Sequence, residues 1–218
     1  MENISKKKLL EILKENNFSQ KIISAFSEVK RENFIPEYLK SYAYEDIALP
    51  LEKGATISQP YTIAFMLSLL ELKNNQKILE IGSGSGYVLS LISKISKQSD
   101  TSRFFSRHRN PDIYGIEIIK SLAESSKIIL KKYKNISIIN KDGSKGLLEH
   151  APFDRILISA SSEKLPTNLY SQLKNSGILV CPVKNSIFQI KKQNSKIKLK
   201  EFPGFVFVPL ISSYRQFG

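Results

Sequence analysis

The sequence predicts an α/β fold with a doubly wound, mostly parallel sheet and helices at its N-terminus. The first observation is the stretch 77–87, where a short apolar run leads into three glycines, Gly82, Gly84 and Gly86, and then into an apolar helix start. This order is typical of a buried strand, a tight loop and a helix. The second observation is the alternation of strand-like and helix-like segments along the rest of the chain, which favours a parallel sheet.

Length and composition favour a single domain over 1–218. A chain of 218 residues with 41% hydrophobic residues can build a sizeable core. The charged N-terminus lacks the apolar segment of a signal peptide, and no run approaches the length of a membrane helix. The one cysteine, Cys181, lies in an apolar run and cannot form an internal disulfide, so we expect a core residue in a reducing compartment.

The formal net charge of +13 allows two interpretations. A polyanionic partner is one, and a lysine-rich composition spread over solvated faces is the other. The lysines are scattered and are not interleaved with aromatic residues, which favours the second interpretation over a nucleic-acid partner. His108 and His150 have no neighbours with metal-ligand spacing, so no metal site is predicted.

The N-terminal part predicts helices followed by an irregular segment. Apolar residues recur at helical spacing over 5–16 and 19–30. Residues 31–57 contain prolines and a glycine, yet they are too apolar for a free linker. A helix is then expected from Pro60, with Ser58 as its candidate N-cap. Ser58 could serve as a cap alone, or it could face an anion at the helix N-terminus.

The remaining elements follow in alternation. We expect a surface insertion over 96–112, which is polar, basic and unpatterned. Strands are expected at 113–117, 136–140, 153–160 and 177–183, helices at 118–133 and 166–175, and antiparallel terminal strands at 186–192, 196–202 and 204–210. Gly177 is expected to close the helix over 166–175.

Three acidic residues come at or after the ends of consecutive predicted strands: Glu80, Glu117 and Asp142. The glycines read G-x-G-x-G, which departs from the dinucleotide spacing, and no Gly-Lys-Ser/Thr follows as in a P-loop. A carboxylate at Glu80 would repel a pyrophosphate but suits a cationic ligand. Glu117, 35 residues after Gly82, is placed to accept ribose hydroxyls, and Asp142 an adenine amino group. Together they point to S-adenosylmethionine, which is cationic and carries no phosphate.

With these pieces placed, the chain resembles the protein-L-isoaspartate O-methyltransferase family. The resemblance covers most of the chain and includes LEIGSGSGY, KDGSKG and FDRILISA. The glycine motif is shared by many methyltransferases, whereas AYEDIALPLEKGATISQP is far more specific to this family. The resemblance implies a seven-stranded Rossmann-like methyltransferase sheet and methyl transfer from S-adenosylmethionine to L-isoaspartyl residues of damaged proteins or peptides in the cytoplasm.

The resemblance also implies roles for individual residues. Ser58 matches the active-site serine, and with Asp46 it is expected to bind the substrate. Residues 1–57 would then provide helices and a substrate-covering segment, and 58–218 the cofactor-binding core. The cofactor contacts implied by the resemblance are Thr56, Ile57, Ser58, Glu80, Gly82, Gly84, Glu117, Asp142 and Gly143.

Two other functions remain open from the sequence. A nucleic-acid methyltransferase fits the same cofactor core and the positive charge, although no basic groove or added binding domain is evident. A non-catalytic cofactor-binding protein is the second, and the presence of Ser58 with all three acids argues against it. We expect the chain to act as a monomer.

Overall fold

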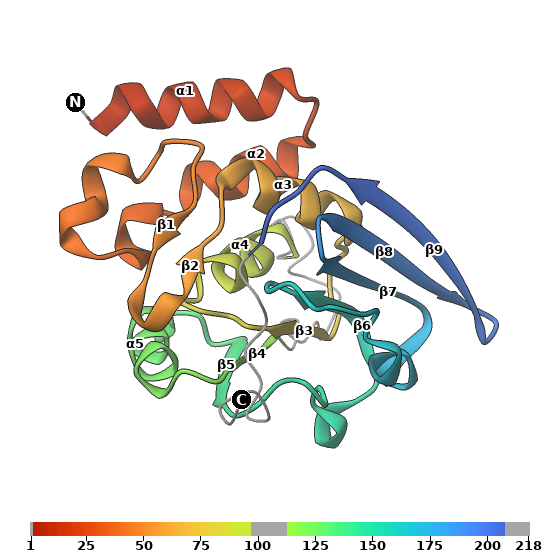
Figure 1. Ribbon diagram of the computed structural model, residues 1–218. Helices are drawn as coiled ribbons and strands as arrows, with labels where there is room; N and C mark the ends of the chain where they lie inside the picture. The colour runs from red at the N-terminus through yellow and green to blue at the C-terminus, as the bar shows by residue number, and fades with distance from the viewer. Residues whose placement is uncertain (1, 97–112, 208–218) are drawn as a thin grey trace, which may run out of the picture.

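One seven-stranded sheet organises the chain, as shown by this computed structural model, which describes residues 2–96 and 113–207 (Figure 1). Its strand order is β5-β4-β3-β6-β7-β8-β9. The bounds are β3 (Ile78–Ile81), β4 (Ile113–Glu117), β5 (Ile136–Asn140), β6 (Phe153–Ile158), β7 (Leu173–Val183), β8 (Ser186–Gln193) and β9 (Lys196–Pro203). The strands from β5 to β7 pair in parallel, and β8 and β9 pair antiparallel. The predicted mostly parallel α/β sheet is confirmed.

Helices α1 to α4 gather on one side of this sheet (Figure 1). The helix bounds are α1 (Glu2–Glu15), α2 (Gln20–Glu28), α3 (Pro60–Leu69), α4 (Tyr87–Ile95) and α5 (Lys120–Leu130). Alternate residues of β3 serve two separate cores, because successive side chains of a strand point to opposite faces. Ile78 packs in the core that includes α1 to α4, whereas Leu79 and Ile81 pack in the second core with Phe153. Glu80 therefore points to the face that α3 and α4 cover.

The segment 31–57 is irregular, as the sequence predicts, and it is anchored to the core. It contains the 3-10 helices η1 (Arg31–Phe34), η2 (Glu37–Tyr42) and η3 (Glu52–Gly54) and two short strands, β1 (Leu49–Pro50) and β2 (Thr56–Ile57). The strands pair antiparallel. Phe34, Ala43 and Leu49 are buried in the same core as the helices, which explains why so irregular a segment is apolar.

The helix predicted over 166–175 is wrong. The structure has a short 3-10 helix, η6 (Thr167–Gln172), and β7 already begins at Leu173. Two contacts explain the difference. Leu173 pairs with Phe153 of β6, which takes its backbone into the sheet, and the side chain of Gln172 is buried, where it accepts a hydrogen bond from the Leu147 N–H. Gly177 lies inside β7 and closes no helix.

Other boundaries differ in smaller ways. The N-cap position of α3 is occupied by Gln59 and not by Ser58, so the capping expectation for Ser58 is wrong. Residues 204–207 form no strand, and the rest of the strand expected over 204–210 lies outside the described residues. The expected insertion over 96–112 lies, apart from its first residue, outside them too.

Two composition-based expectations concern burial. Cys181 is fully buried in the second core, and burial raises the pKa of its thiol to about 12, which confirms its assignment as a small core residue. Within residues 2–96 and 113–207, no helix has the length and apolar character needed to cross a membrane.

Candidate active site

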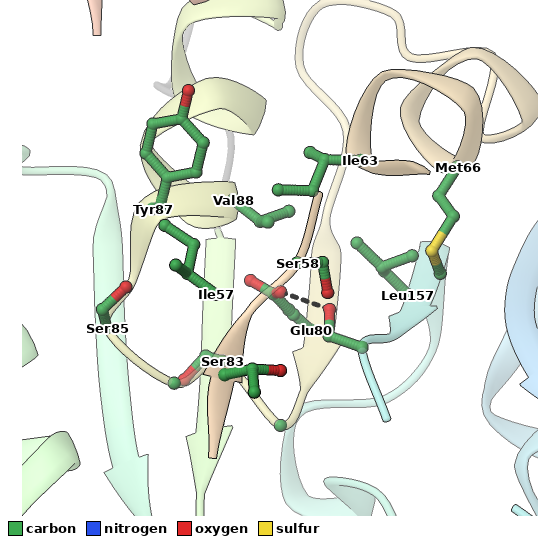
Figure 2. Close-up of a pocket in the computed structure, with 14 residues that line it drawn as sticks. Ile57, Ser58, Ile63, Met66, Glu80, Ser83, Ser85, Tyr87, Val88 and Leu157 are labelled. Atoms are coloured by element: carbon green, nitrogen blue, oxygen red, sulfur yellow. Dashed lines mark hydrogen bonds between the residues drawn. The ribbon is translucent and has the colours of Figure 1, made fainter. Parts of the chain in front are cut away.

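A pocket opens where the carboxyl end of β3 meets the residues that precede α3 (Figure 2). It encloses about 480 Å³ of empty space, part of it open to solvent. Its lining residues come from the β2–α3 segment, α3, the glycine loop, the start of α4, and the ends of β3 and β6. They are Thr56, Ile57, Ser58, Ile63, Met66, Glu80, Gly82, Ser83, Gly84, Ser85, Tyr87, Val88, Leu157 and Ser159. The sequence-predicted residues of 56–58, Glu80 and two glycines thus meet in one place.

Glu80 is the carboxyl group that lines this pocket. Its side chain is only 1% exposed, and one carboxyl oxygen accepts a hydrogen bond from the hydroxyl of Ser159 at 2.6 Å (Figure 2). The other oxygen is buried and has no partner among the described residues. Burial, together with the nearby negative charge of Glu117, raises the pKa of Glu80 to about 8, although the Ser159 hydroxyl opposes that rise. Such a carboxyl is prepared for a cationic ligand that would satisfy its free oxygen.

Glu117 holds the glycine loop in place. One of its carboxyl oxygens accepts a hydrogen bond from the Gly84 N–H at 2.7 Å, and the other accepts one from the Ile119 N–H at 2.8 Å. Glu117 is only 5% exposed, and its carboxylate retains lone pairs for further hydrogen-bond donors. It therefore sits at the end of β4 with its orientation fixed, beside the loop that lines the pocket.

Asp142 and Gly143 follow β5, the next strand along the same edge. Asp142 accepts a hydrogen bond from the Ser144 N–H at 2.8 Å, which closes a tight turn. A Cβ at Gly143 would come within 2.6 Å of Ile81, so only glycine lets this turn approach β3 so closely. Glu117, Asp142 and Gly143 do not line this pocket, so the structure does not bring them together with Glu80 in it, and their cofactor contacts stay predictions.

Ser58 contributes a hydroxyl to the pocket from the opposite wall. It connects β2 to α3, and Figure 2 shows it facing into the cavity that Glu80 also enters. The N-terminus of α3 is capped by Asp46, which accepts hydrogen bonds from the Tyr61 N–H at 2.7 Å and from the side-chain amide of Gln59 at 2.9 Å. The Ser58 hydroxyl is therefore not needed as a cap.

Ser159 and Arg31 are among the residues of this region that the sequence did not assign to the site. Ser159 follows β6, the neighbour of β3, so its place at the carboxyl edge of the sheet was a usable signal. Arg31 is 0% exposed and donates hydrogen bonds to several backbone carbonyls, including that of Ser58 at 3.2 Å. Because Arg31 lies in an irregular segment, no sequence pattern predicts that its side chain is buried and bound to backbone carbonyls. Tyr87 also lines the pocket, but its hydroxyl points away from the cavity (Figure 2).

Comparison with known proteins places this geometry in a family. The family described as protein-L-isoaspartate(D-aspartate) O-methyltransferase matches residues 4–215. The chain belongs to the protein-L-isoaspartate O-methyltransferase family. A relative of that name from Petrotoga mobilis is 40% identical over 203 residues, 89% of each chain. Another from Dictyoglomus thermophilum is 38% identical over 216 residues, covering 96% of this chain and 92% of the relative.

Solved structures with the same family name have the same fold. A putative protein-L-isoaspartate O-methyltransferase from Plasmodium falciparum, in complex with S-adenosyl-L-homocysteine, matches with a TM-score of 0.79 and 26% identity, covering 94% of this chain and 97% of that one. Another protein-L-isoaspartate O-methyltransferase matches with a TM-score of 0.81 and 26% identity. The match covers 94% of this chain and 65% of that longer chain. Members of the family are S-adenosylmethionine-dependent methyltransferases.

The residues of this pocket fit that cofactor. One oxygen of Glu80 and the buried hydroxyl of Ser83 have no hydrogen-bond partner within the described parts of the chain, and a ligand would satisfy them. The glycine loop leaves its backbone accessible without side chains in the way. Carboxyl groups at Glu80 and Glu117 disfavour a phosphate and favour a cation with adjoining hydroxyl donors. The structure thus agrees with the family on a cationic ligand that has no phosphate.

Proposed function

We propose that this chain transfers a methyl group from S-adenosylmethionine to the carboxylate of L-isoaspartyl residues in damaged proteins or peptides, and so starts their repair. The observation that supports this most strongly is the meeting, in one pocket, of a buried carboxyl with a free oxygen and a hydroxyl from the opposite wall. Family membership supplies the reaction class, and the pocket offers one group for each end of the reaction.

The cofactor side of the site follows from the acidic residues. When bound, S-adenosylmethionine supplies an electrophilic methyl group on a sulfonium. We propose that Glu80 binds its cationic methionine end, that Glu117 accepts from its ribose hydroxyls and that Asp142 accepts from its adenine amino group. Gly82 and Gly84 line the pocket without side chains in the way, and Thr56, Ile57 and Ser58 line it from the segment before α3. We propose that these residues and Gly143 also contact the cofactor.

The acceptor side needs no general base. A carboxylic acid with a reference pKa of about 4 is already ionised at neutral pH. We propose that the Ser58 hydroxyl donates a hydrogen bond to the acceptor carboxylate and so aligns one of its oxygens with the methyl carbon. The new C–O bond forms as the C–S bond breaks, which gives a neutral methyl ester and a thioether. Alignment of this kind supplies on the order of 7–11 kcal/mol.

The segment 31–57 is proposed to cover the acceptor and bind the surrounding peptide backbone. Thr56 and Ile57 of its strand β2 line the pocket, whereas Asp46, between η2 and β1, does not. The Asp46 carboxylate accepts two hydrogen bonds from the start of α3. A carboxylate has about four acceptor positions, so Asp46 retains capacity for one substrate amide. Residues 58–218 would then form the cofactor-binding core of the same single domain.

The setting is proposed from the same features. Isoaspartyl proteins and peptides are the partners, the chain acts as a monomer, and it works in the cytoplasm. A single cysteine, which leaves no internal disulfide, supports a reducing compartment.

Methyl incorporation into two otherwise identical peptides tests the function. One peptide carries an isoaspartyl residue and the other a normal aspartyl residue at the same position, and the donor carries a labelled methyl group. The proposal predicts label in the first peptide and background in the second. Equal labelling of both, or labelling of RNA in place of either, would refute the assigned substrate, and tight cofactor binding with no turnover would favour the non-catalytic alternative.

A further inference from the structure

The geometry points to Arg31 as a positioning residue for methyl transfer, acting through the backbone of Ser58. This inference rests on the proposed function and adds a residue that no motif assigns to the site. Arg31 begins η1, well before the pocket in the sequence, and its side chain is 0% exposed. It does not line the pocket, so any influence on the reaction must pass through the residues that it holds.

The guanidinium group of Arg31 joins two parts of the covering segment to the active-site serine. One terminal nitrogen donates to the carbonyl oxygens of Ala43 at 2.8 Å and Glu45 at 3.4 Å. The other donates to the carbonyl oxygens of Ile47 at 3.0 Å and Ser58 at 3.2 Å. Because a guanidinium is planar and its donors have a fixed arrangement, it sets the relative positions of these carbonyls.

Asp46 makes a second set of hydrogen bonds that hold the backbone next to Ser58. Asp46, inside the turn that Arg31 holds, accepts hydrogen bonds from the Tyr61 N–H and the Gln59 side chain at the start of α3. Ser58 is therefore flanked by the Arg31 contact on its own carbonyl and by the Asp46 contacts immediately after it. The serine side chain has one rotatable bond before its hydroxyl, so the backbone position largely decides where that hydroxyl can point.

The contacts of Arg31 fall on the acceptor side of the pocket. None of its hydrogen bonds in the described residues reaches the glycine loop, Glu80 or Glu117. Loss of the guanidinium contacts should therefore displace Ser58 and the covering turn while the proposed cofactor contacts of the glycine loop, Glu80 and Glu117 persist. A misplacement near 1 Å in such a site can lower the rate by about 100-fold.

Arg155 provides a matched control at the other end of the same helix. It is 5% exposed and donates to the carbonyl oxygens of Leu70 at 2.5 Å and Glu71 at 3.0 Å, where α3 ends. It lies near the amino end of β6, whereas the pocket is lined by Leu157 and Ser159 at the carboxyl end of that strand. Both arginines are buried and both bind backbone carbonyls, so Arg155→Lys reproduces the loss of stability without touching Ser58.

The test compares Arg31→Lys with Arg155→Lys in three measurements: kcat/KM for the isoaspartyl peptide, Kd for S-adenosyl-L-homocysteine, and Tm. We expect Arg31→Lys to lower kcat/KM by about 10- to 100-fold with Kd changed less than about threefold, and Arg155→Lys to keep kcat/KM within about threefold. Both should lower Tm. Arg31→Gln, which buries no charge, is the second variant if the lysine variant does not fold.

A double-mutant cycle shows whether Arg31 acts through Ser58. In a Ser58→Ala background, Arg31→Lys should reduce kcat/KM much less than it does in the wild-type chain, because the hydroxyl it positions is gone. Fully multiplicative losses, or equal losses for the two arginine variants, would overturn the inference while the proposed function stands. Failure of both Arg31 variants to bind S-adenosyl-L-homocysteine, where Arg155→Lys binds it, would also overturn it. A wild-type chain inactive on the isoaspartyl peptide would refute the proposed function, and the inference would fall with it.

Discussion

At the scale of single residues, the pocket separates two tasks between two side chains. Glu80 is buried and faces the space where a cation would lie, and Ser58 presents a neutral donor from the other wall. A neutral donor can orient a carboxylate without removing its charge, whereas a lysine or arginine there would hold the nucleophile too strongly. This division predicts separable effects on turnover and on cofactor binding.

Ser58→Ala should therefore lower kcat by about 100-fold, in the range seen when one orienting hydrogen-bond donor is removed. Kd for S-adenosyl-L-homocysteine should stay close to the wild-type value, because the acidic contacts remain. Steady-state methyl transfer and calorimetric binding measure the two quantities. Ser68→Ala is the matched control, since Ser68 is an exposed serine of α3, the helix that follows Ser58, and it donates to the Phe65 carbonyl of its own turn. Unchanged turnover in Ser58→Ala would refute the assigned role.

The raised pKa of Glu80 predicts a pH-dependent affinity. Below a pKa of about 8 the empty pocket holds a neutral carboxyl, and a cationic ligand favours its ionised form, so binding releases a proton. Affinity for S-adenosyl-L-homocysteine, whose amino group is cationic, should rise from pH 6 to pH 8 by up to about tenfold per pH unit. Calorimetry in buffers of different ionisation enthalpy counts the proton.

Glu80→Gln provides the control for that titration. Its affinity should be weaker and nearly independent of pH in the same range. Stability of the free protein should respond in the opposite direction: the folded wild-type chain retains a proton that the unfolded chain loses above about pH 4.5, so this group's contribution to stability declines as pH rises toward 8. The glutamine variant should lack that decline. A wild-type affinity that does not vary with pH would contradict the predicted ionisation.

Part of the site could be predicted from the sequence because its residues lie at the ends of predicted strands. The glycine loop, Glu80 and Glu117 each come at the end of an apolar strand-like run, and strand ends of a parallel sheet meet at one edge. Ser159 shared that signal and was passed over. Arg31 could not be found, because its contacts join residues 12 to 27 positions away through a turn that has no repeating pattern.

At the scale of elements, the glycine loop depends on close packing between α4 and α5. Gly86, directly before α4, has a φ of +83°, and a Cβ built there would lie 2.6 Å from Leu130 of α5. A side chain at this position would meet both an unfavourable backbone conformation and a close contact. The position between the glycine loop and α4 therefore requires glycine.

Gly86→Ala should reduce the free energy of unfolding by about 2–4 kcal/mol, the sum of backbone strain and overpacking. Gly54→Ala is the control, because Gly54 has a similar φ of +76° with nothing within 4 Å of a built Cβ. It should cost only about 1–2 kcal/mol for the backbone alone. Urea unfolding measures both values. Equal losses in the two variants would show that contact with Leu130 is not significant.

The element that the sequence analysis misjudged shows where local patterns fail. Residues 166–175 have helix-like apolar spacing, but tertiary contacts decide their conformation. Leu173 joins the sheet opposite Phe153, and the side chain of Gln172 serves a backbone donor across the chain. A buried pairing of that kind outweighs a weak helical preference over so short a segment. The strands of the parallel sheet were predictable because their apolar runs fit a buried strand and no tertiary contact favours another conformation.

At the scale of the whole molecule, the sheet brings together groups that lie far apart in the chain. Ser58, Glu80 and Ser159 reach one pocket from the β2–α3 segment, β3 and the end of β6. A ligand that spans these elements contacts the folded chain only. It should therefore stabilise the whole fold against unfolding.

S-adenosyl-L-homocysteine at about 100 times its Kd should add about 2.7 kcal/mol to the stability. For a chain of this size, that corresponds to a rise in Tm of about 5–10 °C. Thermal unfolding followed by circular dichroism measures it. NAD is the control ligand, because its pyrophosphate would face the carboxyl of Glu80, and it should leave Tm unchanged. A comparable rise with NAD would contradict the proposed charge selectivity of the site.

The most direct measurement of the central proposal is a crystal structure of this chain with S-adenosyl-L-homocysteine and an isoaspartyl peptide. The account predicts the amino end of the cofactor product at the free oxygen of Glu80, its ribose at Glu117 and the peptide carboxylate within hydrogen-bonding distance of the Ser58 hydroxyl. An adenosyl group bound elsewhere, or a Ser58 side chain turned away from the sulfur and the carboxylate, would contradict it.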